Sequence, residues 1–381
     1  MVSDPLAVLV LLAAVVVVSL KLEARFPLFR SLGAALVGIL LGMVLSNAGI
    51  IPGMSSVYEF LHSTGVSVGI VLILLSVDLR TMVQAGPSML AAFGLGAVGT
   101  ATGAIVAGLM LQDAIGDETW KLTGQFTGTY TGGGMNFAAL GQAFGTSSNL
   151  FTAAIAADVI LTAFWMAACL AVPVLLGKRG GSEAAAPSAE VSDKPMTLER
   201  LLYSSGRPLL LADAAALVAI AAGTVWGAGA LARVMPFLPE VLWLTTLSLV
   251  AAQVPAIKRL AGAAVLGNYL VLLFLASNGA QSVVANIVRV GPAVFYFACI
   301  TVACHGVVLF GFGRLFKMDL GTLAIASQAN IGGAASAMAM ASARGYGDRL
   351  LPGVAVGLFG YAVGNYLGFA VAALMQNLLS S

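Results

Sequence analysis

Long apolar runs, separated by short polar stretches, recur along almost the whole chain. Runs of about twenty residues match the length that a helix needs to cross a hydrocarbon core of ~30 Å. The sequence shows no series of alternating segments of the kind that forms membrane barrels. The pattern therefore predicts an all-α polytopic membrane protein. The predicted spans are 5–20, 31–50, 60–79, 88–112 and 149–176, then 208–229, 237–255, 260–280, 291–313 and 351–377.

Composition supports this class. Of the 381 residues, 60% are hydrophobic and 9% are charged, whereas a soluble domain carries about 25% charged residues. The net charge of +2 gives no reason to expect a nucleic-acid partner. The three cysteines lie in apolar runs without a C-x-x-C pair, so neither a disulfide framework nor a zinc site is expected. The apolar N-terminal stretch lacks a clear cleavage site and is interpreted as a retained helix.

A polar stretch rich in Ser, Ala and Pro, residues 178–207, divides the chain into two halves, 1–177 and 208–381. We interpret this stretch as a cytoplasmic linker. Two further segments, 117–146 and 319–343, are either full spans or hairpins that enter and leave the membrane on one side. With hairpins and an outside N-terminus, 15 Lys and Arg residues face the cytoplasm and 3 face out. With two full spans the split is 8 to 10. The positive-inside rule favours hairpins, five spans per half and both termini outside. The plasma (inner) membrane is the expected location.

Each predicted hairpin turns on glycines, at Gly132-Gly133-Gly134 and at Gly332-Gly333. Adjacent glycines are poor at continuing a helix, and irregular backbone at membrane depth is tolerated only beside protein or a water-filled cavity. A broken helix offers amides to an anion and carbonyls to a cation. Spaced glycines elsewhere are expected to serve helix packing. These spaced glycines are Gly94, Gly96, Gly99 and Gly103.

The two halves repeat their landmarks in one order. Because each half has an odd number of spans, the second half would be inverted relative to the first, as in many secondary transporters. The intervals between landmarks differ, so the repetition is divergent. The paired landmarks are Asp78 with Asn278, Gly86-Pro87 with Gly291-Pro292, Gly133-Gly134 with Gly332-Gly333, and Asp158 with Asn365.

Four motifs make the chain resemble the YjcL-like family of membrane proteins, a family of unknown function in the cation–proton antiporter and anion transporter group. They are Ser76–Arg80, Thr131–Leu140, Ala329–Ala334 and Leu351–Leu367. At greater distance the chain is similar to sodium–glutamate symporters and 2-hydroxycarboxylate transporters, which carry Gly-Gly-x-Gly at two re-entrant tips; residues 132–135 and 332–335 depart from that pattern. The resemblance implies a homodimer with a scaffold domain, a moving transport domain and sodium as the preferred coupling ion.

Asp158 is the leading candidate for a cation or proton site, since an ionisable residue deep in a span is functional by default. Packing remains an alternative for it, as it does for mid-span His305. Asp78 and Asn278 lie near span ends, where an ion pair or a helix cap is equally expected. A sodium ion is expected near Asp158, Thr131 and Asn330. The remaining substrate- or ion-binding candidates are Gly132, Gly133, Gly134, Asn136, Gln328, Gly332, Gly333, Ser336 and Asn365.

The sequence thus favours an ion-coupled transporter of a small organic solute, such as an anion, amino acid or small peptide, working by elevator-type alternating access. No cofactor is expected beyond a coupling Na⁺ or H⁺, and the expected partners are the solute, the ion, lipid and a second copy of the chain. A monovalent cation–proton antiporter using Asp158 is the first alternative, and a receptor or assembly module is the second. No catalytic motif supports an enzyme.

Overall fold

The computed structural model describes residues 2–80, 85–176 and 208–380, and the regular elements of these ranges are all helices. The predicted linker, 178–207, lies outside the described residues. Each of the ten predicted spans falls on a helix, and eight helices are long and apolar enough to cross a membrane. Two others, Leu32–Asn47 and Glu240–Ala252, are apolar but shorter. The all-helical class is therefore confirmed.

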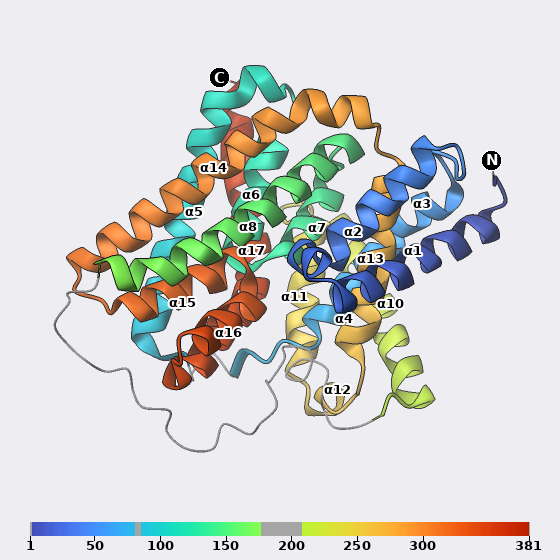
Figure 1. The fold of residues 1–381 in the computed structure, drawn as a ribbon. Coiled ribbons are helices and arrows are strands. Elements are labelled where there is room, and N and C mark those ends of the chain that lie inside the picture. Colours follow the sequence, from blue (N-terminus) through green and yellow to red (C-terminus); the bar gives the residue numbers. More distant parts are fainter. Residues whose placement is uncertain (1, 81–84, 177–207, 381) are drawn as a thin grey trace.

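The helices form two bundles, each built from both halves of the chain (Figure 1). The first bundle contains α1 (Pro5–Arg25), α2 (Pro27–Asn47), α3 (Ser56–Phe60), η1 (Leu61–Gly65), α4 (Val66–Leu74), α10 (Leu211–Val234), α11 (Glu240–Ala252), α12 (Pro255–Lys258) and α13 (Ala263–Ala280). The second contains α5 (Gly86–Ile115), α6 (Thr119–Gly132), α7 (Gly134–Phe144), α8 (Ser148–Leu176), α14 (Val284–Leu315), α15 (Leu320–Ile331), α16 (Gly333–Ala343) and α17 (Gly347–Ser380). Helix α8 also contacts α2 and α13, and α7 contacts α4 and α11, so these helices join the bundles.

Two helices of the second bundle break at the glycines that the sequence singled out. Helix α6 ends where Gly133 adopts φ 96°, and α7 begins at the next residue. Helix α15 ends before Gly332, and α16 starts at Gly333 with φ 73°. Positive φ values strain residues that carry a Cβ, which explains why glycine occupies both positions.

A ladder of glycines brings the backbones of α6 and α17 into direct contact. A Cβ on Gly368 would lie 2.7 Å from the Gly124 carbonyl oxygen, and a Cβ on Gly364 would lie 2.9 Å from that of Gly128. Small residues at four-residue spacing allow such close approach in membrane proteins. The three facing pairs of this ladder are Gly124–Gly368, Gly128–Gly364 and Gly132–Gly360.

Glycines of α5 play a similar part against α14. Gly96, Gly99 and Gly103 pack on the turns of α14 that carry His305 and Thr301. Gly94 differs, because an added Cβ would meet nothing within 4 Å. The predicted packing role therefore fits three of these four glycines.

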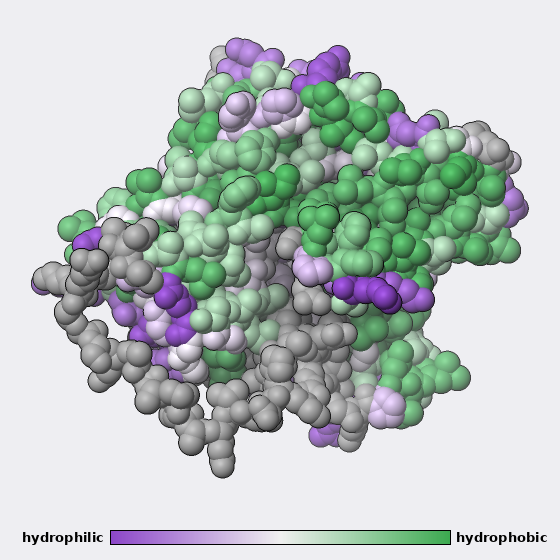
Figure 2. Space-filling view, viewed as in Figure 1, coloured by the Kyte–Doolittle hydropathy of each residue, from purple (hydrophilic) through white to green (hydrophobic). Residues whose placement is uncertain are grey.

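The outer surface is apolar over wide areas. Hydrophobic residues cover most of the face in Figure 2, and hydrophilic residues gather in separate patches. Large side chains such as Phe164, Trp226 and Val307 are more than two-thirds exposed. A surface of this kind suits contact with lipid, as the hydropathy pattern predicts.

We predict that Gly360→Ala destabilises the protein by about 1–3 kcal/mol, because overpacking a tight contact costs that much. The new Cβ would lie 2.5 Å from the Thr131 carbonyl oxygen and 2.6 Å from Gly132 Cα. Gly223→Ala in α10 is the matched control, since nothing lies within 4 Å there. Both changes gain the same helix propensity, so this gain cancels when the two variants are compared. We expect the melting temperature in detergent to fall for Gly360→Ala alone, and this fall measures the packing cost. Equal melting temperatures would contradict it.

Candidate functional site

The two helix breaks meet inside the second bundle. A Cβ on Gly133 would lie 3.5 Å from Gly333 Cα, and one on Gly333 would lie 3.3 Å from the Gly132 carbonyl oxygen. The ring of Tyr361 in α17 lies beside both glycines. The chain therefore gathers two interrupted helices, one from each half, at a single point.

Two cavities open beside this point. The first, which we name the α13 cavity, has a volume of about 300 Å³ and lies between α7, α8 and α13. The second, the α16 cavity, has a volume of about 420 Å³ and lies between α8 and the α15–α16 break. Gly134, Asp158 and Val159 line both cavities. The first turn of α7 and one carboxylate are thus shared between two spaces.

Asp158 is the only charged side chain that lines either cavity among the described residues. The hydroxyls of Tyr130 and Thr162 lie next to its carboxyl group. The Tyr130 hydroxyl and Asp158 Oδ1 are both buried without completing a hydrogen bond within the described part of the chain. The Asp158 carboxyl group thus has hydroxyl neighbours but, among the described residues, no basic side chain beside it in either lining, and such a carboxylate can take up a cation or a proton.

Four of the predicted site residues line the cavities: Gly134, Asp158, Gly332 and Ser336. Gly133 and Gly333 form the breaks behind them, and Gly132 belongs to the glycine ladder. Sequence analysis missed Thr162 and Tyr361, which line the α16 and α13 cavities respectively. Tyr361 could have been found from the sequence, because it lies inside the motif Leu351–Leu367.

Three predicted residues instead satisfy the backbone around the breaks. The Thr131 hydroxyl donates to the Thr127 carbonyl oxygen at 2.7 Å. Asn136 Nδ2 donates to the carbonyl oxygens of Gly360 at 3.0 Å and Gly128 at 3.3 Å. Asn330 Nδ2 donates to those of Phe93 at 3.1 Å and Ala326 at 3.0 Å. Broken helices need such partners, since unpaired buried backbone groups are costly.

Four others lie outside the linings of both cavities. Asn365 Nδ2 donates to Thr245 Oγ1 at 3.0 Å, and Asn278 is buried. Both amide atoms of buried Gln328 lack a hydrogen-bond partner among the described residues. Asp78 pairs with Lys258 at 2.7 Å and accepts from the backbone amide of Arg80. The ion-pair interpretation of Asp78 agrees with this geometry, although the partner is Lys258.

A buried histidine connects five helices around the breaks. His305 Nδ1 lies 3.0 Å from both the Gly96 carbonyl oxygen and Thr100 Oγ1. Thr100 donates its hydrogen to the Tyr130 carbonyl oxygen at 2.9 Å, so Nδ1 carries its own hydrogen. Ser327 Oγ accepts from Trp165 at 2.8 Å and donates to His305 Nε2 at 2.9 Å. These bonds link α5, α6, α8, α14 and α15 and suit the neutral Nδ1–H tautomer.

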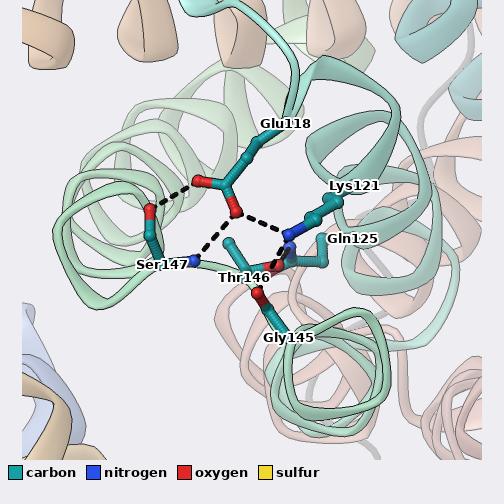
Figure 3. Close-up of polar contacts among 6 residues, drawn as sticks. All are labelled: Glu118, Lys121, Gln125, Gly145, Thr146 and Ser147. Atoms are coloured by element: carbon teal, nitrogen blue, oxygen red, sulfur yellow. Dashed lines mark hydrogen bonds and ion pairs between the residues drawn. The ribbon is translucent and has the colours of Figure 1, made fainter.

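A polar cluster joins the outer ends of α6 and α7 (Figure 3). Lys121 Nζ donates to Glu118 Oε1 at 2.7 Å and to the Gly145 carbonyl oxygen at 2.9 Å. Glu118 also accepts from the Ser147 hydroxyl at 2.5 Å and the Ser147 amide at 3.1 Å. The α6–α7 segment therefore starts and finishes at the same place, with its break at the other end.

The α15–α16 segment is joined in a similar way. Asp319, which caps α15, accepts from the Thr322 amide at 2.7 Å and from Arg349 at 2.7 Å. The Arg349 guanidinium in turn lies 4.7 Å from the centre of the Tyr346 ring. Each segment thus has an acidic residue just before its first helix that contacts the chain just after its second helix. These contacts are Glu118 with Ser147 after α7 and Asp319 with Arg349 after α16. Nothing in the sequence spacing identified this shared device.

No group of three or more His, Cys, Asp or Glu side chains that could hold a metal ion occurs among the described residues. The charge of the site rests on Asp158, and its other polar groups are amides and hydroxyls. A transition-metal centre lacks donors within this part of the chain.

The fold and the cavities define a multi-pass helical membrane protein. The chain belongs to the family described as Protein of unknown function (DUF819), which matches residues 7–378. It is 27% identical over 364 residues to the Uncharacterized membrane protein YjcL of Bacillus subtilis (strain 168), and the match covers 92% of each chain. The family resemblance expected from the four motifs is confirmed.

We predict that His305→Ala lowers the free energy of unfolding by about 2–5 kcal/mol, because it opens a cavity and leaves buried polar partners unpaired. His62→Ala is the matched control, since this half-buried ring makes one hydrogen bond, with Gln281 at 2.9 Å. Thermal unfolding of both purified variants in detergent measures the difference. Similar losses in the two variants would contradict the bridging role of His305.

The Glu118 cluster gives a pH-dependent prediction. Burial alone would raise the pKa of the Glu118 carboxyl, but hydrogen bonds from Lys121 and Ser147 and the Lys121 charge outweigh it and lower this pKa. A lowered folded-state pKa adds stability above the unfolded value of about 4.3, and this stability is lost as pH falls through the folded pKa.

We therefore expect Glu118→Gln to cost roughly 1 kcal/mol near neutral pH, where partial exposure screens the pair. The difference from the unsubstituted protein should shrink as pH is lowered below about 4. Asp117→Asn, which changes the exposed neighbouring carboxylate, is the control. Melting curves recorded over a pH series test this, and a difference that is independent of pH would exclude the ionic contribution.

Proposed function

We propose that this protein is an ion-coupled secondary transporter of a small organic solute. The observation that carries the proposal is the meeting of two broken helices beside a carboxylate and two cavities. Broken helices at corresponding places in the two halves are typical of transporter binding sites. A receptor or an assembly module gives these breaks no purpose.

The helix ends supply the chemistry of such a site. Gly133 caps α7 without a side chain, and Gly134 in the first turn of α7 lines both cavities. The amides of this turn carry the positive end of the helix dipole. Asp158 supplies the negative charge for a coupling cation, with sodium preferred from the family resemblance and the proton as its competitor.

Alternating access would follow from relative motion of the two bundles. In this proposal the second bundle, with both breaks, is the moving transport domain, and the first is the scaffold of a homodimer. The α6–α7 and α15–α16 segments are then re-entrant hairpins of two inverted repeats. The joined outer ends of each segment support this, because both legs of a hairpin begin and finish on one side. The membrane is the plasma membrane, with both termini outside.

A second candidate is a monovalent cation–proton antiporter. The observation that favours it is that one carboxylate, Asp158, lines both cavities. A single carboxylate that binds a proton and a cation in turn is sufficient for exchange. The α13 cavity favours the solute transporter instead, because a small ion has no need of its apolar wall.

Transport by purified protein in proteoliposomes tests the proposal. We expect imposed sodium or proton gradients to drive uptake from a mixture of labelled amino acids and short monocarboxylates. Asp158→Asn should abolish coupled uptake, because the carboxylate that binds the ion is lost, whereas Glu59→Gln on the exposed face of α3 should not. Undiminished uptake by Asp158→Asn would remove Asp158 from the site. Cation exchange that needs no solute would overturn the symporter in favour of the antiporter.

A further inference from the structure

The charge pattern of the α13 cavity narrows the chemical class of the solute. No Lys, Arg or His lines this cavity or the α16 cavity among the described residues, and Asp158 lines both. An anion placed here meets a carboxylate beside a mostly apolar lining, without a side-chain cation to offset the repulsion. When Asp158 is ionised and holds no coupling cation, the cavity therefore favours a ligand that brings a positive group of its own.

The opposite pole of the cavity is the first turn of α7. Gly134 lines the α13 cavity together with Asp158, and the preceding Gly133 provides no side-chain cap. Helix α7 runs for 11 residues, enough for its amino end to attract a negative group. A second, independent observation is that Asp158 Oδ1 is buried and completes no hydrogen bond, and that neither lining offers it a basic side chain within the described residues. One small cavity thus presents a negative and a positive pole.

The remaining wall is apolar and limits the size of the ligand. Ile73, Ile155, Val271 and Leu275 line it between α4, α8 and α13. Its volume of about 300 Å³ is at the lower end for ligand sites, which run from about 300 to 1,000 Å³. A single amino acid suits this space better than a peptide.

We propose that the α13 cavity binds a zwitterionic α-amino acid with an apolar side chain. Its ammonium group contacts Asp158 from the α13 cavity, and the coupling cation of the proposed function would contact the same carboxylate from the α16 cavity. Its carboxylate lies at the amino end of α7, and its side chain contacts the apolar wall. This inference rests on the proposed transport function for its purpose, but it concerns binding alone.

Three probes that share one branched apolar body test it on the purified full chain in detergent. They are L-leucine, 4-methylpentanoate, which lacks the ammonium group, and 3-methylbutylamine, which lacks the carboxylate. We expect calorimetry to show leucine binding, with each truncated probe at least ~10-fold weaker, because a site built for a polar group discriminates strongly against its absence. Binding of 4-methylpentanoate as tight as that of leucine would overturn the proposal, as would no binding of any probe.

Three variants locate the site. Asp158→Asn should remove the preference for leucine over 4-methylpentanoate. Ala264→Leu, which fills the α13 cavity, should abolish leucine binding, whereas Ala91→Leu on the exposed face of α5 should retain it. Retained leucine affinity in Ala264→Leu would contradict the placement. If Asp158→Asn fails to fold, two measurements still test the proposed site. They are the comparison of the three probes and the comparison of Ala264→Leu with Ala91→Leu.

The two proposals fail in different ways. Leucine binding without gradient-driven uptake in proteoliposomes would contradict the transport function and leave the amino-acid site in place. Coupled uptake of monocarboxylates without leucine binding would contradict the amino-acid site and leave the transport function in place.

Discussion

Direct backbone contact between α6 and α17 is the constraint on which the rest of the site depends. An interrupted helix can exist at membrane depth only where protein surrounds it. The glycine ladder provides that surrounding by bringing the Gly360 backbone against Gly132, one residue before the break. The freed groups then find partners within reach, as when Asn136 donates to the Gly360 carbonyl oxygen. Any side chain in the ladder would separate the helices and leave these groups exposed to lipid.

The same contact explains why polar residues near the breaks divide into two kinds. Residues of the helices before each break, such as Thr131 of α6 and Asn330 of α15, donate hydrogen bonds to backbone carbonyl oxygens of α6, α15 and α5. Residues that face the cavities, such as Asp158 and Ser336, come from α8 and α16. Residues of α6 and α15 thus hold the breaks in shape, while residues of α8 and α16 line the cavities. His305 extends this support by connecting α5 and α14 to both interrupted helices.

Much of this arrangement could be predicted from the sequence, because it depends on local patterns. Hydropathy located the ten apolar helices, and contiguous glycines located both breaks. The partners of individual side chains depend on contacts between distant segments, which one sequence does not contain. Asp78 illustrates this, since an ion pair was among the roles expected for it, but its partner Lys258 lies far along the chain. The shared lining at Gly134 and the contacts between Glu118 and Ser147 escaped prediction for the same reason.

The two halves differ at one pair of corresponding positions, and this difference sets the formal charge of the proposed site. In the proposed repeat, Asp158 of α8 corresponds to Asn365 of α17, an amide that donates to Thr245 in the first bundle. Asn365 lines neither cavity, so the formal charge of both linings comes from Asp158 alone within the described residues. The proposed site therefore carries one formal negative charge, which one proton or one metal ion would balance, whereas a zwitterionic solute would add no net charge.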